Sequence, residues 1–360
     1  MGEVSFISLP FQPMKSMKTP FYFSTAIMGE YLASLFDGEY YLGINSLHSF
    51  KQYSDEECNE FVEKFDFINR KKIYFDADYI EPIKEIIQKL YVAGDIQIRT
   101  ESTAVCECGR AEITESEIKR FNEINMDMQL AGEDEEGLKC RVCGNKLEFK
   151  LRKSLFLKIK EEELNEKMNI HPDYLNSDVN HFRKSLQGSF LRISRERNTG
   201  VVINLDGQEF NLDIDMLWKF IPICIESSKI IVVSSVKHLF SLYIINYLAK
   251  IMDKEVYFVG LPFIQTSEIG EKVMDFYKDN AHRNSLRLLV DLGIGWNKKN
   301  IMLQESTCKY FMSSKDKNNE LIDFIYKAKV EDEDWNLMKK SIISYTHLQR
   351  VIGIKKLQNK

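Results

Sequence analysis

The chain has 360 residues, of which 44% are hydrophobic, so it is long enough to bury at least one full core and to form two or three modules. Its 49 basic and 54 acidic side chains give a formal charge of −5, which excludes a global positive field that would attract DNA or anionic lipid. The first residues lack the pattern of a secretory signal and no run of about 18 apolar residues occurs, so we expect a cytoplasmic protein without a membrane partner.

The first module, residues 1–95, has the pattern of an opening parallel α/β unit. An aromatic segment at 21–23 predicts a strand, the spacing of apolar residues at 27–36 predicts a helix, and YYLGI at 40–44 predicts a second strand. Helical periodicity recurs in two later segments, which are residues 55–69 and 78–93.

Residues 96–160 differ in character and predict an inserted module. The segment contains a short strand pattern, a cysteine pair, a helical pattern at 113–128, a second cysteine pair and a longer strand pattern at 146–159. We therefore expect the chain to leave the first half of a sheet here and to return to it afterwards.

Four of the seven cysteines form two short pairs, and a glycine follows each pair. The ligands proposed from this pattern are Cys106, Cys108, Cys140 and Cys143. Two thiolates on one tight turn can hold half of a tetrahedral zinc site, and a second such turn completes it. The spacing of the first pair is one residue shorter than usual. Because four thiolates leave no open position for water, we predict a structural zinc ion.

Residues 161–270 predict the second half of an open parallel sheet. IIVV at 230–233 and VYFVG at 256–260 have the composition of buried parallel strands, and an amphipathic segment at 236–252 separates them. Further helical patterns cover three segments, which are residues 161–169, 178–187 and most of 271–360.

Four segments carry more specific patterns. They are TAVCECGRAEITESEI at 103–118, LRISRERNTGVVI at 191–203, VYFVGLPF at 256–263 and DFYKDNAHRNSLRLLV at 275–290. In this order they resemble the catalytic core of class I aminoacyl-tRNA synthetases, and methionyl-tRNA synthetase most of all. The resemblance implies an α/β fold with a Rossmann-type parallel sheet, split by a zinc-binding connective insertion and followed by a helical C-terminal region. It also implies an amino acid and ATP as ligands.

The resemblance places the HIGH motif of the family at residues 27–30, in the first helix. Gly29 is retained and would let an adenine approach the backbone closely. Both histidines are absent, and Glu30 would bring a negative charge toward the triphosphate. Ser24 and Thr25 offer hydroxyl donors to a nucleotide, or else serve only to cap the helix.

The KMSKS loop of the family has two counterparts in the chain. By position after the last strand it corresponds to residues 264–268, where Thr266 and Ser267 are polar but no lysine occurs. By similarity of the residues themselves it corresponds to residues 311–315, much later in the chain. We adopt the positional match, because this loop must follow the last parallel strand to reach a site at the carboxyl ends of the strands.

The resemblance implies a changed amino-acid pocket as well. Family members hold the substrate ammonium with an aspartate after the second strand, where this chain offers Asn45 and His48. A tryptophan–aspartate pair becomes LDIDML, which keeps Asp213 or Asp215 and loses the aromatic ring. We therefore do not expect methionine specificity. His48 and His238 lie near predicted strand ends. Each is either a residue of the site or a structural residue.

Positive charges that could replace the missing phosphate-binding groups are few. We name Arg195, Arg197 and Lys237 as replacements, with solvated surface charge as the alternative. The stretch after Gly295 is also short for an anticodon-binding bundle, so we do not expect anticodon-dependent charging of tRNA.

Three functions remain open from the sequence. The first is a synthetase-like enzyme that activates or couples an amino acid, as an ester or amide, in a specialised natural-product pathway. The second is an inactive pseudo-synthetase that binds a partner protein, a nucleotide or the acceptor end of a tRNA. The third is a transferase that uses aminoacyl-tRNA as donor and needs no ATP, which is an analogy at the level of the fold.

Overall fold

The computed structural model describes residues 4–13, 24–47, 53–66, 68, 71–123, 131–134, 137–160, 167–196, 200–266 and 300–303.

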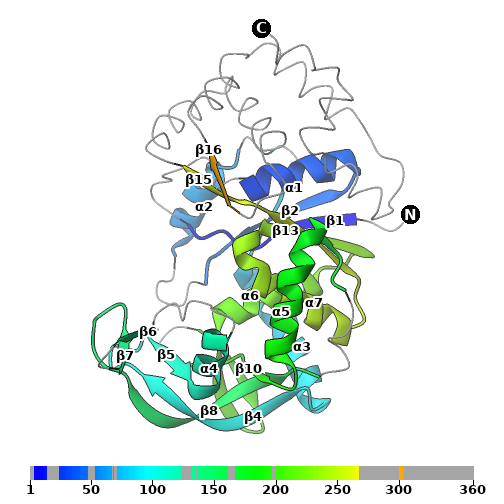
Figure 1. Ribbon diagram of the computed structural model, residues 1–360. Helices are drawn as coiled ribbons and strands as arrows, with labels where there is room; N and C mark the ends of the chain where they lie inside the picture. Colours follow the sequence, from blue (N-terminus) through cyan, green and yellow to red (C-terminus); the bar gives the residue numbers. More distant parts are fainter. Residues whose placement is uncertain are drawn as a thin grey trace.

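A six-stranded sheet forms the centre of the structure, and all of its strand pairs are parallel (Figure 1). In spatial order the strands are β3 (Lys72–Phe75), β2 (Glu39–Ile44), β1 (Val4–Ser8), β13 (Lys229–Ser235), β14 (Val256–Leu261) and β9 (Ile170–His171). The strands before residue 50 and those after residue 228 thus belong to one sheet, because β1 pairs directly with β13. One parallel sheet is thus built from segments that lie far apart in the sequence.

The first strand of the sheet, β1, was not predicted. All five residues of β1 are buried, so the segment shows no alternation of apolar and polar side chains. Two of them are serines, which weakened the apolar signal. The strand predicted at 21–23 lies outside the described residues. The helix predicted at 161–169 is wrong at 167–169, where an extended segment leads into β9, and its first six residues are not described.

Helices cover both faces of the parallel sheet and pack against one another (Figure 1). They are α1 (Ser24–Leu35), α2 (Asp55–Glu63), α3 (Ile80–Val92), α5 (Asn176–Leu186), α6 (Ile214–Cys224) and α7 (Leu239–Ile251). Short 3-10 turns precede three of them, which are η2 (Asp76–Tyr79), η4 (Asp173–Leu175) and η5 (Val236–His238). The sequence patterns predict all of these α-helices except α6. The segment LDIDML, where α6 begins, resembles a family motif but does not by itself predict a helix.

An antiparallel sheet lies below the parallel one in Figure 1. Its strands, in the order β10-β8-β4-β5, are β10 (Phe190–Arg192), β8 (Glu148–Lys158), β4 (Ile96–Val105) and β5 (Glu112–Thr114). The ladder between β4 and β8 runs without interruption from the Ile96–Leu157 pair to the Val105–Glu148 pair. Helix α4 (Glu115–Glu123) and the hairpin of β6 (Ala131–Asp134) and β7 (Gly137–Cys140) complete this part.

Two small sheets connect these parts. The hairpin of β11 (Val201–Leu205) and β12 (Gln208–Leu212) turns at Asp206 and Gly207, which both have positive φ, as a two-residue hairpin turn requires. Strand β15 (Phe263–Thr266) pairs in parallel with β16 (Asn300–Leu303).

The buried apolar side chains include a large cluster and a small one, and others, such as Phe6 of β1 and Leu32 of α1, belong to neither. The large cluster joins the parallel sheet to α3, α6 and α7 and extends under the β11–β12 hairpin. The small cluster belongs to the part that carries the four cysteines, which we call the cysteine lobe and define as the described residues between 103 and 147. The two parts therefore have separate cores.

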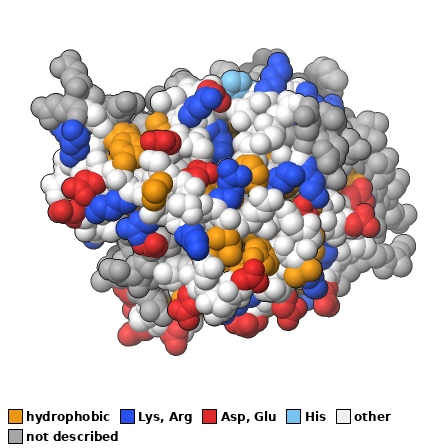
Figure 2. Space-filling model, turned by 90° about the horizontal axis from the view of Figure 1, so that it is seen from below, with side chains coloured by type: hydrophobic (Ala, Val, Ile, Leu, Met, Phe, Trp, Pro, Cys, Tyr) orange, Lys and Arg blue, Asp and Glu red, His pale blue; other side chains and the backbone are white. Residues whose placement is uncertain are grey.

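The face seen in Figure 2 mixes basic, acidic and isolated hydrophobic side chains. Exposed apolar residues on β8 are Phe149 and Leu151, with relative exposures of 51% and 77%. Within the described segments, no helix is both long enough and apolar enough to cross a bilayer.

Candidate functional site

Two tight turns, each closed by a hydrogen bond from the N–H of a glycine, carry the four cysteines. The N–H of Gly109 donates to the carbonyl oxygen of Cys106 at 2.9 Å, and the N–H of Gly144 donates to that of Cys140 at 2.8 Å. Both glycines have positive φ, +71° and +77°, a conformation that glycine adopts without strain. The first turn closes from residue i+3 to residue i and the second from i+4 to i, so the shorter spacing of the first pair goes with a turn that is one residue tighter.

The four sulfur atoms lie in one cluster, all within 4.8 Å of one another. The Sγ atoms of Cys106 and Cys143 are 3.4 Å apart. Those of Cys108 and Cys140 are 3.7 Å apart. A disulfide would need about 2.05 Å, whereas thiolates around a tetrahedral zinc ion with bonds of about 2.3 Å lie about 3.8 Å apart. A hydrogen bond from the N–H of Arg110 lowers the pKa of Cys108 to about 7, so this thiol ionises near neutral pH. The cluster fits a structural zinc ion.

The cysteine lobe has a very small core of its own. Its buried apolar residues are Ala104, Cys106, Ala111, Ile113, Ala131, Cys140 and Leu147. Two of these are proposed zinc ligands. A core of this size rarely stabilises a fold without a metal or a disulfide, so a metal in the sulfur cluster would supply stability that packing does not.

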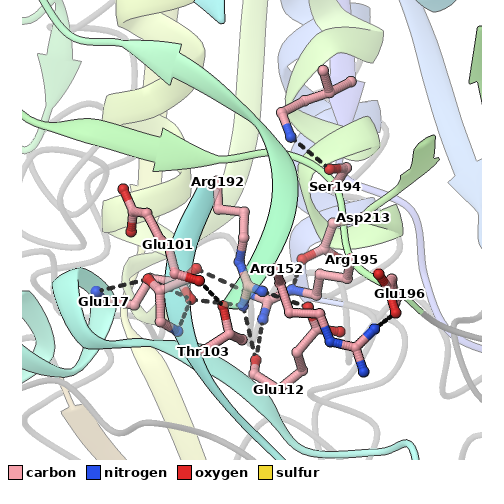
Figure 3. A network of polar contacts seen from close by, with 12 residues as sticks. Glu101, Thr103, Glu112, Glu117, Arg152, Arg192, Ser194, Arg195, Glu196 and Asp213 are labelled. Atoms are coloured by element: carbon pink, nitrogen blue, oxygen red, sulfur yellow. Dashed lines mark hydrogen bonds and ion pairs between the residues drawn. The ribbon is translucent and has the colours of Figure 1, made fainter. Parts of the chain in front are cut away.

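A buried network of ion pairs joins the cysteine lobe to the rest of the protein (Figure 3). Arg192, at the end of β10, bonds to Glu112 at 2.6 Å and to Glu117 at 2.7 Å. Arg195 pairs with Glu117 at 3.3 Å and also with Asp213. The Arg192 side chain is fully buried, and the three carboxylates are at most 7% exposed.

Glu117 belongs to the network and also starts helix α4. The N–H of Thr114 donates to Glu117 at 2.9 Å, and the N–H of Glu117 donates to the hydroxyl of Thr114 at 3.1 Å, which is a capping box. Burial alone would raise the pKa of Glu117, but the charges of Arg192 and Arg195 outweigh burial and hold the pKa below its ordinary value. The carboxylate is therefore ionised in the folded protein.

Asp213 joins the same network to the parallel half. It is the N-cap of α6, where one carboxylate oxygen accepts from the N–H of Asp215 at 3.1 Å. Its other oxygen pairs with Arg195. The network thus fixes α4, the end of β10 and the start of α6 relative to one another.

A cavity of about 210 Å³ lies against this network. One wall comes from the cysteine lobe, and the other comes from α6, α7 and the residues that follow β13. Charged and polar residues that line it are Arg110, Glu112, Glu117, Arg120, Arg192, Arg195, Asp213, Asp215, Lys219, Lys237, His238 and Ser241. Since Lys237 and His238 come directly after β13, the cavity opens at the carboxyl edge of the parallel sheet, where α/β folds place their ligands.

Five residues that the sequence named as site candidates meet at this cavity. They are Arg195, Asp213, Asp215, Lys237 and His238. The charge of Arg195 is already engaged by Asp213 and Glu117. The Nζ atom of Lys237 lies 3.2 Å from the centre of the Phe263 ring, a cation–π contact.

His238 lies within hydrogen-bond distance of Ser234, with 3.0 Å between its Nδ1 atom and the serine Oγ. Its side chain is exposed to solvent. Desolvation by the surrounding protein atoms nevertheless lowers its pKa, and the nearby charges of Lys219 and Lys237 lower it further. A neutral imidazole that can accept a proton is the expected form at pH 7.

A second group of polar residues follows β2 and β3. Asp76 accepts hydrogen bonds from the N–H of Ser46 at 2.7 Å, from its hydroxyl at 2.6 Å and from the indole of Trp218 at 3.0 Å. Burial raises the pKa of Asp76 in spite of these bonds. The neighbouring Asn45 is fully buried, and neither polar atom of its carboxamide has a partner among the described residues.

The nucleotide-binding candidates on α1 lie apart from the cavity lining. Ser24 begins the helix and Thr25 follows it. A Cβ atom added to Gly29 would lie 2.3 Å from the Tyr40 ring, so the missing side chain allows close packing of α1 on β2. Glu30 is only 1% exposed. Their binding of a nucleotide remains a prediction.

Other candidates cannot be placed. His48, Arg197, Ser267 and residues 311–315 lie outside the described residues, as does most of the predicted helical region at 271–360. Thr266 ends strand β15.

No protein-family model and no curated protein matches the chain. The comparison with solved structures gives a likeness of fold. Methionyl-tRNA synthetase of Mycobacterium tuberculosis in complex with methionyl-adenylate superposes with a TM-score of 0.63 and 13% identity, over 89% of this chain and 70% of that one. A second structure of that enzyme, bound by methionyl-adenylate, has a TM-score of 0.63 and 11% identity, over 87% of this chain and 68% of that one. The apo form has a TM-score of 0.55 and 12% identity, over 86% of this chain and 65% of that one.

The chain has a class I synthetase-like fold. This agrees with the fold that the sequence resemblance implied. At 11–13% identity the likeness extends to the fold and not to the substrate.

Sequence reasoning missed several residues of this candidate site. Glu112, Glu117 and Arg192 were not named, although the spacing of Thr114 and Glu117 is that of a capping box. Lys219 was also missed. Its signal was a single charge within the apolar run LWKFIPIC.

Replacement of Cys140 by serine is expected to remove the metal and to destabilise the cysteine lobe, since the lobe core is too small to fold alone. We expect wild-type protein to contain about one zinc ion per chain and the variant to contain almost none, with a lower melting temperature. Elemental analysis and calorimetry test this. Cys224→Ser, on α6 outside the lobe, is the matched control and should keep its zinc. Metal-free wild-type protein with unchanged stability would contradict the assignment.

Replacement of Glu117 by glutamine is expected to lower the free energy of unfolding by about 3–5 kcal/mol at pH 7, because it leaves buried arginine charge uncompensated. The folded pKa of Glu117 lies below the ordinary 4.5, so its contribution is present above pH 4.5 and is lost as the pH falls through the folded pKa. The variant should therefore lose less stability on acidification. Denaturant titrations between pH 7 and pH 3 measure both effects.

Glu123→Gln, at the exposed end of the same helix, is the matched control, and it should change stability by about 0.5 kcal/mol or less. Equal effects of the two substitutions would show that the network does not stabilise the fold.

Proposed function

We propose that the protein is a methionyl-tRNA-synthetase-like enzyme that activates or couples a small amino acid, as an ester or amide, in a specialised natural-product pathway. The observation that carries this proposal is the cavity at the carboxyl edge of the parallel sheet, where Asp215, Lys237 and His238 converge. The solved structures with a similar fold hold methionyl-adenylate, which supports a carboxylate-activating reaction for this fold.

The proposed reaction has two steps. The carboxylate of the amino acid attacks the α-phosphorus of ATP, the bond to pyrophosphate breaks, and an aminoacyl-adenylate forms. An amine or hydroxyl then attacks the carbonyl carbon, gives up its proton, and AMP leaves. Lys237 would offset negative charge on the phosphates in the first step. Neutral His238 would accept the proton in the second.

In this proposal the four cysteines hold zinc with a folding role alone. Four thiolates complete the coordination of the metal, so it would not bind substrate. The acceptor end of a tRNA and a pathway protein are the proposed partners for the second step.

A pseudo-synthetase is the second candidate function, and one observation favours it. Arg195, a proposed replacement for the missing phosphate-binding groups, is already paired with Asp213 and Glu117. Glu30, at the HIGH position, is buried. On this reading the cavity binds a ligand or the tRNA acceptor end without activating it. The third candidate, a transferase fed by aminoacyl-tRNA, would use the same cavity.

Exchange of labelled pyrophosphate into ATP, dependent on an amino acid, is the measurement that separates these functions. We expect exchange with the wild-type protein and a loss on the order of 10²-fold in Lys237→Ala, since one charge contact in the transition state has about this effect. Lys89→Ala, on the exposed face of α3, is the control and should leave exchange unchanged.

Absence of exchange with all standard and non-standard amino acids would contradict the proposal and favour the pseudo-synthetase. Product formation from aminoacyl-tRNA after ATP is depleted would favour the transferase instead.

A further inference from the structure

Two buried cations line the cavity without an ion pair among the described residues. Arg120, on α4, is 6% exposed, and one of its five N–H donors reaches the carbonyl oxygen of Phe190 at 2.7 Å. Lys219, on α6, is 8% exposed and donates to the carbonyl oxygen of Asp215, one turn earlier in the helix. Within the described residues, each charge thus has a single backbone carbonyl as its hydrogen-bond partner.

The acids whose charges act on Arg120 form their ion pairs elsewhere. These acids are Glu117, Glu101 and Glu123. Their basic partners are Arg192 and Arg195 for Glu117, Arg99 for Glu101 and Lys119 for Glu123. Burial therefore outweighs the three acids and lowers the pKa of Arg120.

Lys219 is in a similar position. The charges of Asp215 and Asp213 act on it, but neither carboxylate forms an ion pair with it within the described residues. Asp213 is held by Arg195, and Asp215 has interactions of its own. Burial lowers the pKa of Lys219, as it does that of Arg120. A buried charge without a counterion is unfavourable, so an anionic ligand would stabilise both cations.

The two cations come from opposite walls of the cavity, because α4 belongs to the cysteine lobe and α6 to the parallel half. The described lining contains six lysine and arginine side chains and four aspartate and glutamate side chains. This is a surplus of two positive charges, however the acids are paired. The cavity therefore favours a ligand with two negative charges, one for each wall.

The size and the apolar lining of the cavity restrict that ligand. Its volume of about 210 Å³ is below the roughly 300–1,000 Å³ of sites for drug-sized molecules. Leu191, Met216, Phe240 and Ile244 also line it. A pyrophosphate ion carries two anionic groups but has no apolar surface to match these side chains. A short carbon chain with a carboxylate at each end matches both the charges and the apolar lining.

We propose that the cavity binds a short dicarboxylate, with one carboxylate paired with Arg120 and the other with Lys219. An arginine fork can hold a carboxylate through two N–H donors, and a lysine ammonium can hold the second one as a point charge. The ligand would then bridge the cysteine lobe and α6. This inference goes beyond the proposed function, because it concerns a ligand of the cavity and needs neither ATP nor an adenylate.

Calorimetric titrations of the full chain with malonate, succinate, glutarate and adipate test this, each against the monocarboxylate with the same number of carbons. We expect at least one dicarboxylate to bind the wild-type protein about tenfold more tightly than its matched monocarboxylate, because the monocarboxylate lacks one charge-assisted hydrogen bond. Arg120→Met and Lys219→Met should each abolish this preference. Lys119→Met, next to Arg120 but on the exposed side of α4, is the matched control and should keep it.

Both variants are expected to fold, since each replaces a buried charge without an ion pair by an apolar chain of similar length. Should one fail to fold, the wild-type preference decides, together with Arg120→Lys and Lys219→Arg, which keep the charges and should keep the preference in part. Equal affinity of the wild type for dicarboxylate and monocarboxylate, or an unchanged preference in the folded Met variants, would overturn the inference. Tighter competitive binding of phosphate or pyrophosphate would do so too, and would assign the site to a phosphoryl group.

These results can be separated from those of the proposed function. Binding of a dicarboxylate without pyrophosphate exchange would support the dicarboxylate site and contradict the proposed enzyme. Exchange that depends on an amino acid, in a protein that binds none of the four dicarboxylates, would support the enzyme and overturn the dicarboxylate site.

Discussion

The buried pairing of two arginines with three carboxylates is the constraint on which the candidate site depends. Arg192 and Arg195 hold Glu112 and Glu117 of the cysteine lobe, and Arg195 also holds Asp213 at the start of α6. An unpaired charge at such a depth costs several kcal/mol, so displacement of the lobe would expose or orphan several charges at once. One arrangement of lobe and sheet is therefore strongly favoured, and the cavity wall is preorganised before any ligand binds.

The network also separates structural charge from charge that can act on a ligand. Arg195 lies at the cavity, yet its charge is compensated by the protein, whereas Lys219 and Lys237 have no ion pair within the described residues. The class I synthetase-like fold thus has positive charge at the carboxyl edge of its parallel sheet. A metal held by the four cysteines would contribute indirectly, because it would stabilise the lobe that presents Glu112 and Glu117.

Much of the fold followed from local sequence patterns. Long periodic segments predicted α3 and α7, and the apolar runs of β13 and β14 predicted central strands. The cysteine cluster followed from spacing alone, because both turns close on a glycine. Strand β1 escaped detection because it is short and buried on both faces. The ion pairs could not be predicted because their partners lie up to 80 residues apart, and charge partners at such separations leave no periodic signal. Lys219 could be recognised only once its burial was known.

A double-mutant cycle on Arg195 and Asp213 tests most directly whether this network joins the two halves of the site. Asp213→Asn preserves the helix cap while it removes the charge, and Arg195→Met removes the other partner. Unfolding free energies of both single variants and of the double variant give the coupling energy. The account predicts that the pair is coupled by about 1–3 kcal/mol, within the range for contacting residues of one network. Additive effects within about 0.3 kcal/mol would contradict it.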